Sequence, residues 1–62
     1  MNAKESFETA LIVNKTRIQI LQEAIIQLES EFNESDQKNY GYANSLNKVN
    51  EDLIEIILFI KS

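Results

Sequence analysis

The sequence predicts an all-α protein: an antiparallel hairpin of two long helices, with hairpins associating into a four-helix bundle. Residues 1–62 form a single domain in this prediction. The chain has no proline and one glycine, so almost nothing in it interrupts a helix. Its apolar residues recur at alternating spacings of four and three, which is the heptad pattern of packed helices. Hydrophobic residues make up 44% of the chain, more than two helices can cover on each other, and this favours association.

The first helix is expected over residues 3–32. Asn2, with Glu5 three positions later, fits a capping box at its start. Its heptad seam, the row of residues at alternating spacings of four and three, comprises Phe7, Leu11, Asn14, Ile18, Leu21, Ile25, Leu28 and Phe32. The row is unbroken and has one polar member.

The second helix is expected over residues 36–61, after a turn at 33–35. Ser35 would be its N-cap, and Asp36 would place a negative charge in the first turn, at the positive end of the helix dipole. This start puts Gly41 inside the helix at a cost of about 1 kcal/mol. The alternative is a longer loop that ends near Gly41; we favour the early start because it makes the two helices similar in length. The seam of this helix comprises Tyr42, Leu46, Val49, Leu53, Ile56 and Ile60.

Both helices carry apolar residues outside their seams. At about 100° per residue, the side chains of Val13, Ile20 and Ala24 form a second row displaced by more than 90° from the first seam. The run LIEIILFI at residues 53–60 likewise has an off-seam pair, Ile54 and Leu58. Contiguous apolar rows mark interaction surfaces, so we expect a homo-oligomer, most simply a dimer, rather than a frayed and exposed tail. The expected oligomer interface comprises Leu11, Val13, Asn14, Ile20, Ala24, Ile54, Ile57, Leu58 and Phe59.

Two polar residues accompany the apolar rows of the first helix. Asn14 lies inside the seam, where a buried amide bonded to its symmetry mate would fix register and oligomer number; the alternative is a solvated position at the rim. Arg17 flanks the second row, where it could pair with an acid across the interface or extend its stem over apolar neighbours.

The end of the hairpin that holds the loop is acidic. A candidate surface for a protein partner comprises Glu29, Glu31, Glu34, Asp36, Tyr40 and Tyr42. Tyrosine gives a large contact area at a low cost in conformational entropy, which suits recognition. The alternatives are a solubilising acidic face and a pair of aromatic residues that cap the bundle.

Composition argues against several classes of protein. The chain has no cysteine and no histidine, so we expect no catalysis, no metal and no cofactor. The formal net charge of −4 argues against nucleic acid as a partner. The apolar run is short of the roughly 20 residues that span a bilayer, and Glu51, Asp52 and Glu55 would be repelled by anionic lipid. With no secretory signal pattern at the start, a cytoplasmic location is expected.

In length and in its two-helix plan, the chain resembles the small plasmid copy-control proteins, which dimerise as helical hairpins and bind RNA loops. The resemblance extends to no motif. Three functions therefore stand as expectations: first, an oligomeric hairpin that binds and regulates another protein as a regulator or adaptor; second, an RNA-binding regulatory dimer, as the resemblance implies; third, a purely structural oligomerisation unit.

Overall fold

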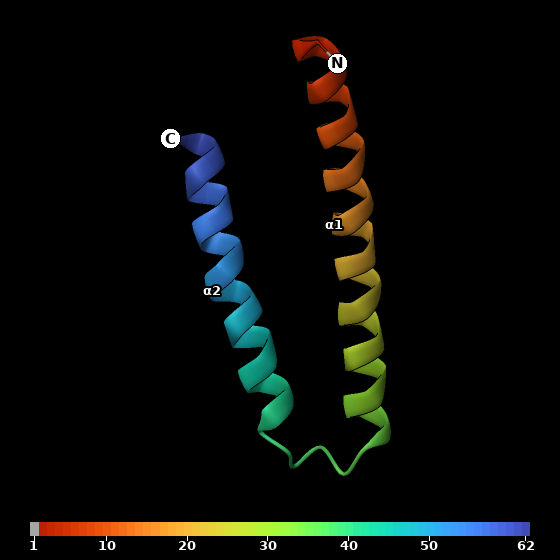
Figure 1. Ribbon diagram of the computed structural model, residues 1–62. Helices are drawn as coiled ribbons and strands as arrows, with labels where there is room; N and C mark the ends of the chain where they lie inside the picture. Colours follow the sequence, from red (N-terminus) through yellow and green to blue (C-terminus); the bar gives the residue numbers. More distant parts are fainter. Residues whose placement is uncertain (1) are drawn as a thin grey trace. The chain divides into compact units, whose positions relative to one another are not determined.

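The structure, a computed structural model, describes residues 2–62 and contains two α-helices with no strand in that range (Figure 1). Helix α1 spans Ala3–Glu34 and helix α2 spans Gly41–Lys61. The all-α prediction is confirmed. The chain divides into two compact units, of which the first ends at Glu31 and the second begins at Phe32.

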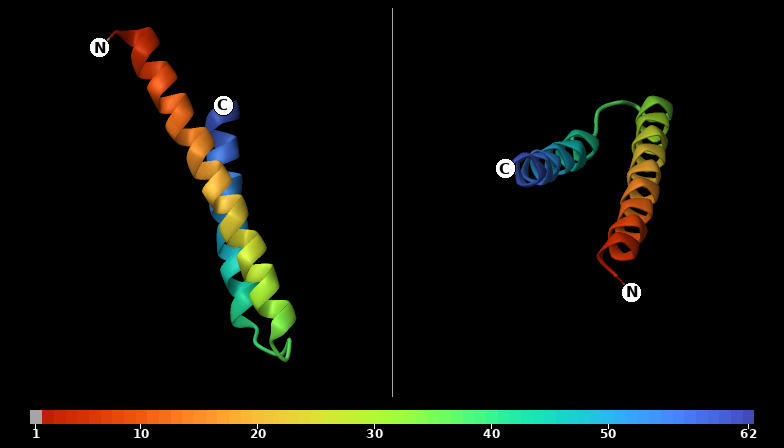
Figure 2. Two further views of the ribbon diagram at one scale, coloured as in Figure 1. Left: turned by 90° about the vertical axis from the view of Figure 1, so that its right-hand side faces the viewer. Right: turned by 90° about the horizontal axis from the view of Figure 1, so that it is seen from above.

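Helix α1 begins where the sequence predicts. The side-chain Oδ1 of Asn2 accepts a hydrogen bond from the backbone N–H of Glu5 at 2.8 Å, and the Asn2 carbonyl accepts one from Ser6 at 2.9 Å. The first bond satisfies one of the N–H groups that a helix start leaves without partners, the second is the first i→i−4 bond of the helix, and the predicted cap at Asn2 is confirmed. The helix then continues without a break to Glu34, two residues beyond the predicted end (Figure 2).

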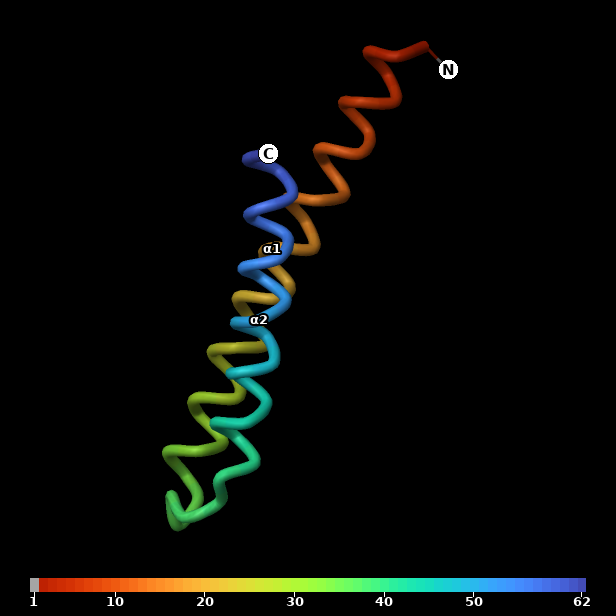
Figure 3. The backbone as a smooth tube through the Cα atoms, turned by 90° about the vertical axis from the view of Figure 1, so that its left-hand side faces the viewer, coloured from red at the N-terminus to blue at the C-terminus, as the bar shows by residue number. Residues whose placement is uncertain are grey.

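The predicted start of the second helix at residue 36 is wrong. Helix α2 begins at Gly41, so the alternative with the longer loop is the one observed, and Gly41 is the first helical residue (Figure 3). The two helices are also unequal, with 32 residues in α1 and 21 in α2.

Local hydrogen bonds explain the late start of α2. Ser35 does not cap a helix: its hydroxyl donates back to the Phe32 carbonyl at 2.6 Å and accepts from the N–H of Gln37 at 3.1 Å. Gln37 has a φ of 60°, in the left-handed region, which an α-helix cannot contain.

Two further side chains hold the rest of the loop. Asp36 accepts from the N–H of Lys38 at 3.1 Å, and Asn39 accepts from the N–H of Gly41 at 2.8 Å. Short polar side chains that bond the backbone two residues ahead compete with helix formation. The carboxylate of Asp36 therefore serves the loop and lies outside the first turn of α2.

No side chain among residues 2–62 is buried. The least exposed apolar residues of α1 are Leu21, Ile25, Leu28 and Phe32, and those of α2 are Tyr42, Leu46, Val49 and Leu53. All of them belong to the predicted seams. The other apolar residues of both helices are exposed.

Candidate interaction surfaces

The apolar residues expected at an oligomer interface on α1 all lie at its surface. Val13 and Leu11 are each 39% exposed and Ile20 is 58% exposed, while the small Ala24 is also exposed. Val13, Ile20 and Ala24 share one face of the helix, since their spacings of seven and four bring them into line. These residues therefore form an exposed apolar strip on α1.

Asn14 is exposed, and its side-chain amide already has one partner within α1. Its Nδ2 donates to the carbonyl of Ala10, four residues earlier, at 2.9 Å. This bond orients the amide along the helix surface and leaves the Oδ1 atom as an acceptor for a group outside the helix. The suggested bond to a symmetry mate stays a prediction.

Arg17 lies inside the second row of α1, a more central place than the flank that the sequence analysis gave it. The residues three and four positions away from it, Val13, Asn14, Ile20 and Leu21, include no acid. At alternating spacings of four and three, the row extends further than the three apolar residues first noted, and we define the α1 second row as Ser6, Ala10, Val13, Arg17, Ile20 and Ala24. All its members are exposed. Counting alternate spacings of four and three from Val13 along the sequence would have placed Arg17 in this row.

Helix α2 carries a comparable row. Ile54 and Ile57 are 58% and 49% exposed and lie three positions apart. Continued at the same alternating spacings, they define the α2 second row as Ala43, Asn47, Asn50, Ile54, Ile57 and Lys61, all exposed. Leu58 is exposed beside this row.

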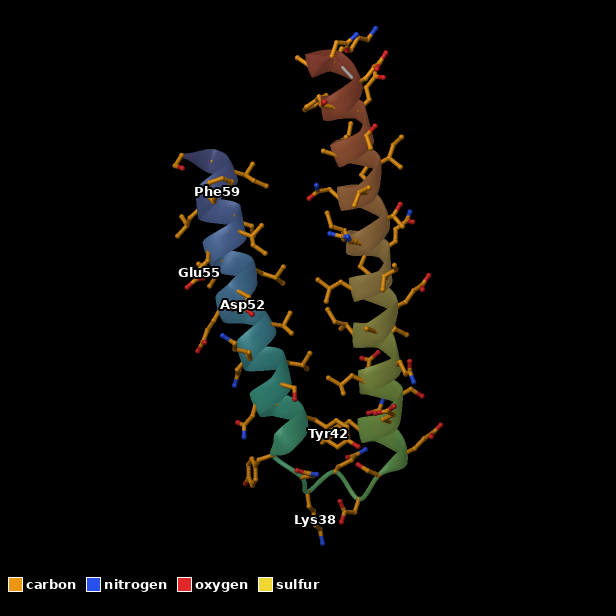
Figure 4. All side chains as sticks on the ribbon, in the orientation of Figure 1. Lys38, Tyr42, Asp52, Glu55 and Phe59 are labelled. Carbon is orange, nitrogen blue, oxygen red and sulfur yellow. The ribbon has the colours of Figure 1, made fainter. Side chains whose placement is uncertain are left out.

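Phe59 differs from the other residues expected at the interface on α2. It is 81% exposed and lies on the charged side of α2, the side that also carries Asp52 and Glu55 (Figure 4). On that side Lys48 pairs with Asp52, with a distance of 3.2 Å between Nζ and Oδ1. Phe59 is therefore an isolated exposed aromatic residue that belongs neither to the seam nor to the second row of α2.

The two tyrosines of the candidate partner surface have different environments. Tyr42, at the start of α2, packs edge-on against Phe32, with 5.6 Å between the ring centroids (Figure 4). Tyr40 is 84% exposed and helps to line an open hollow in the loop. The hollow is lined by Phe32, Gln37, Lys38, Asn39, Tyr40 and Ala43. Tyr42 thus has a packing role within its own unit, while Tyr40 is free to contact another molecule.

The acidic residues near the loop also separate by environment. Glu29, Glu31 and Glu34 lie on the exposed surface of the last turns of α1, which hold no basic residue in the final turn. Glu31 accepts a long hydrogen bond of 3.4 Å from Gln27, and Asp36 is occupied by the loop backbone. Negative charge in the last turn of a helix is unfavourable, so Glu31 and Glu34 lower the stability of α1 rather than support it.

Within residues 2–62, neither helix has the length and hydropathy that crossing a membrane would need. The same residues contain no group of three side chains that could hold a metal ion. No family model matches the chain, and neither a curated protein nor a solved structure matches it. The α1 second row, the α2 second row and the loop are the surfaces of this chain that could carry a function.

Proposed function

We propose that this chain is a small self-associating module for protein–protein interaction, in which the two helices pair as an antiparallel hairpin and copies join through their second rows. The observation that carries the proposal is that both helices leave a full heptad row of their surface exposed and bury no side chain. Each row contains exposed aliphatic residues, Val13 and Ile20 in α1 and Ile54 and Ile57 in α2, and clusters of exposed apolar residues are typical of association surfaces. In this proposal the module acts as a regulator or adaptor in the cytoplasm.

The heptad registers support the hairpin. When the seams are aligned antiparallel, residue for residue, every seam position from Asn14 to Phe32 meets a seam position of α2. The pairs are Phe32 with Tyr42, Leu28 with Leu46, Ile25 with Val49, Leu21 with Leu53, Ile18 with Ile56 and Asn14 with Ile60. The contact between Phe32 and Tyr42 is the first of these pairs, next to the loop.

Burial of the second rows would supply a large part of the stability. Fully burying one large aliphatic side chain stabilises by roughly 1.5–3 kcal/mol. The rows expose four of them, Val13, Ile20, Ile54 and Ile57. A hairpin of about 60 residues has only a few kcal/mol of stability from its own core, so association is a major contribution to folding.

Sedimentation equilibrium at micromolar concentration tests the proposal directly, and we expect at least a dimer. A well-folded monomer at that concentration would contradict it. The matched pair of variants is Ile20→Ser and Ile26→Ser: Ile20 belongs to the α1 second row, whereas Ile26 is an equally exposed isoleucine on another side of α1. Only Ile20→Ser is expected to shift the protein toward monomer.

The loop hollow and its neighbouring glutamates are the proposed site for the protein partner. Tyr40 gives an exposed aromatic contact, and Glu29, Glu31 and Glu34 would complement a basic partner. Affinity capture from the source cell, carried out both with and without nuclease treatment, provides the test. A protein retained by the wild type and lost with Tyr40→Ala supports the site, whereas capture of RNA that weakens steeply between about 50 and 200 mM salt would favour the RNA-binding alternative.

A further inference from the structure

We infer that the cover of the α1 second row is the α2 second row of another copy of this chain, packed antiparallel with Arg17 beside Asn50 and Glu51. The inference rests on the proposed self-association and names the surfaces, the register and the ionic contact that would produce it.

Arg17 determines which surface can cover its row. If two α1 rows packed on each other, a parallel arrangement would put two copies of Arg17 in the same layer. An antiparallel arrangement that aligns Val13 or Ile20 with Arg17 would put the two guanidinium groups in neighbouring layers. Like charges at a desolvated contact cost several kcal/mol. The α1 row is therefore unsuited to pack on itself.

The α2 row meets the requirements of the α1 row. Aligned antiparallel, the two rows pair Ser6 with Lys61, Ala10 with Ile57, Val13 with Ile54, Arg17 with Asn50, Ile20 with Asn47 and Ala24 with Ala43. Small residues face large ones or each other, and the guanidinium faces an amide oxygen that can accept its hydrogen bond. Ile20 against Asn47 is the one poor match.

Charge adds a second argument for the same partner. Glu51 follows Asn50 and is the acid nearest to that layer, whereas the positions one turn from Arg17 on its own helix hold no acid. Among residues 2–62 the structure holds one ion pair, between Lys48 and Asp52, so neither Arg17 nor Glu51 is already engaged. An Arg–carboxylate pair at the edge of an apolar seam gives both register and partner specificity.

The register also determines how copies add to one another. The α1 row precedes its seam by one residue, and the α2 row follows its seam by one residue. In the proposed antiparallel hairpin, the α1 second row and the α2 second row therefore lie on opposite sides of the hairpin. The two rows of one copy thus face two different neighbouring copies. Such head-to-tail contacts close as rings or grow as filaments, and they give assemblies larger than the simple dimer expected from the sequence.

Complementary charge reversals test the contact between copies. Arg17→Glu and Glu51→Arg are made in separate chains and measured by sedimentation velocity and circular dichroism. Alone, each variant should associate about ten-fold or more weakly than wild type, because like charges then meet. Mixed in equal amounts, the two chains should recover the assembly. In the mixture, the new acid at position 17 of one chain meets the new base at position 51 of the other, and the unchanged Arg17 and Glu51 of the two chains also meet.

The controls separate this inference from the proposed function. Lys15→Glu and Glu55→Arg make the same charge changes at positions that take no part in the proposed contact and should leave assembly unchanged, alone or mixed. If Arg17→Glu or Glu51→Arg unfolds when alone, recovery of helix on mixing the two chains still supports the contact. Wild-type protein that assembles while the mixture fails to recover would overturn the inference alone. A monomeric wild type would overturn the proposed function as well, and variants that assemble normally would overturn the Arg17 contact.

Discussion

At the scale of single residues, the start of α2 depends on a contact between Asn39 and Gly41. The side-chain oxygen of Asn39 accepts the Gly41 N–H, and a methyl group at position 41 would lie 3.0 Å from that oxygen. Glycine therefore lowers helix propensity while it leaves room for the Asn39 side chain that accepts its N–H.

A double-mutant cycle can measure this coupling. Alone, Gly41→Ala should change stability little, because its propensity gain of up to about 1 kcal/mol is offset by displacement of the Asn39 side chain that accepts the N–H of residue 41. With Asn39→Ala already present, the same change should stabilise by about 0.5–1 kcal/mol. Chemical denaturation of the four proteins at one protein concentration gives the coupling energy, and equal effects in both backgrounds would show that the two residues act independently.

Substitution of Asn14 tests whether this seam position of α1 is buried in the assembly. If the amide is buried there, Asn14→Leu should raise thermal stability, because desolvating an amide costs more than one hydrogen bond returns. It should also loosen oligomer number, giving mixed species in light scattering. A shift within about 0.5 kcal/mol with a single unchanged species would instead place Asn14 at a solvated rim, as its bond to Ala10 in the free helix permits.

At the scale of helices, the sequence predicted the periodic segments well and their junction poorly. Residues 3–32 and 42–60 carry long heptad patterns, and both are helical. The junction at 35–40 depends on three short side chains that bond the backbone two residues ahead, and on one left-handed residue, Gln37. Such bonds are weak individually and have no periodicity, so the pattern could not distinguish a turn at 33–35 from a longer loop.

Ile57 and Phe59 are close in the sequence of α2 but lie on different sides of the helix. Ile57 is a member of the α2 second row, whereas Phe59 projects from the charged side. We expect Ile57→Ser to weaken association at least ten-fold and Phe59→Ser to leave it nearly unchanged, although phenylalanine is the larger side chain. Sedimentation velocity over a dilution series compares the two variants; a larger effect of Phe59→Ser would mean that the interface includes the charged side.

At the scale of the whole molecule, folding and association are expected to be one process. In the proposed assembly, each hairpin has a small core, and its rows gain most of their burial from other copies. The melting temperature should therefore rise with protein concentration, over a range of about 1 to 100 µM. A melting temperature that is constant over this range would indicate that the hairpin is stable by itself.

The candidate site was predictable only in part from the sequence. Val13, Ile20 and Ile54 could be assigned to association because their spacing departs from the seams. The loop hollow and the separation of Tyr40 from Tyr42 depend on the backbone path through residues 35–40, which no pattern specifies.

The loop at 35–40 has a consequence for the range of folds open to this chain. Counted through the loop, the alternation of four and three from Phe32 to Tyr42 continues without a change of phase, with Ser35 and Asn39 at the two intervening seam positions. A chain whose loop became helical would thus have one continuous stripe, on a rod roughly 90 Å long at about 1.5 Å per residue. Two such rods would pair along their whole length as a two-stranded coiled coil. This is a form of domain swapping in which both helical segments pair with another copy. The local bonds of Ser35, Asp36 and Asn39 oppose this straightened form, as do the left-handed turn at Gln37 and the packing of Phe32 against Tyr42.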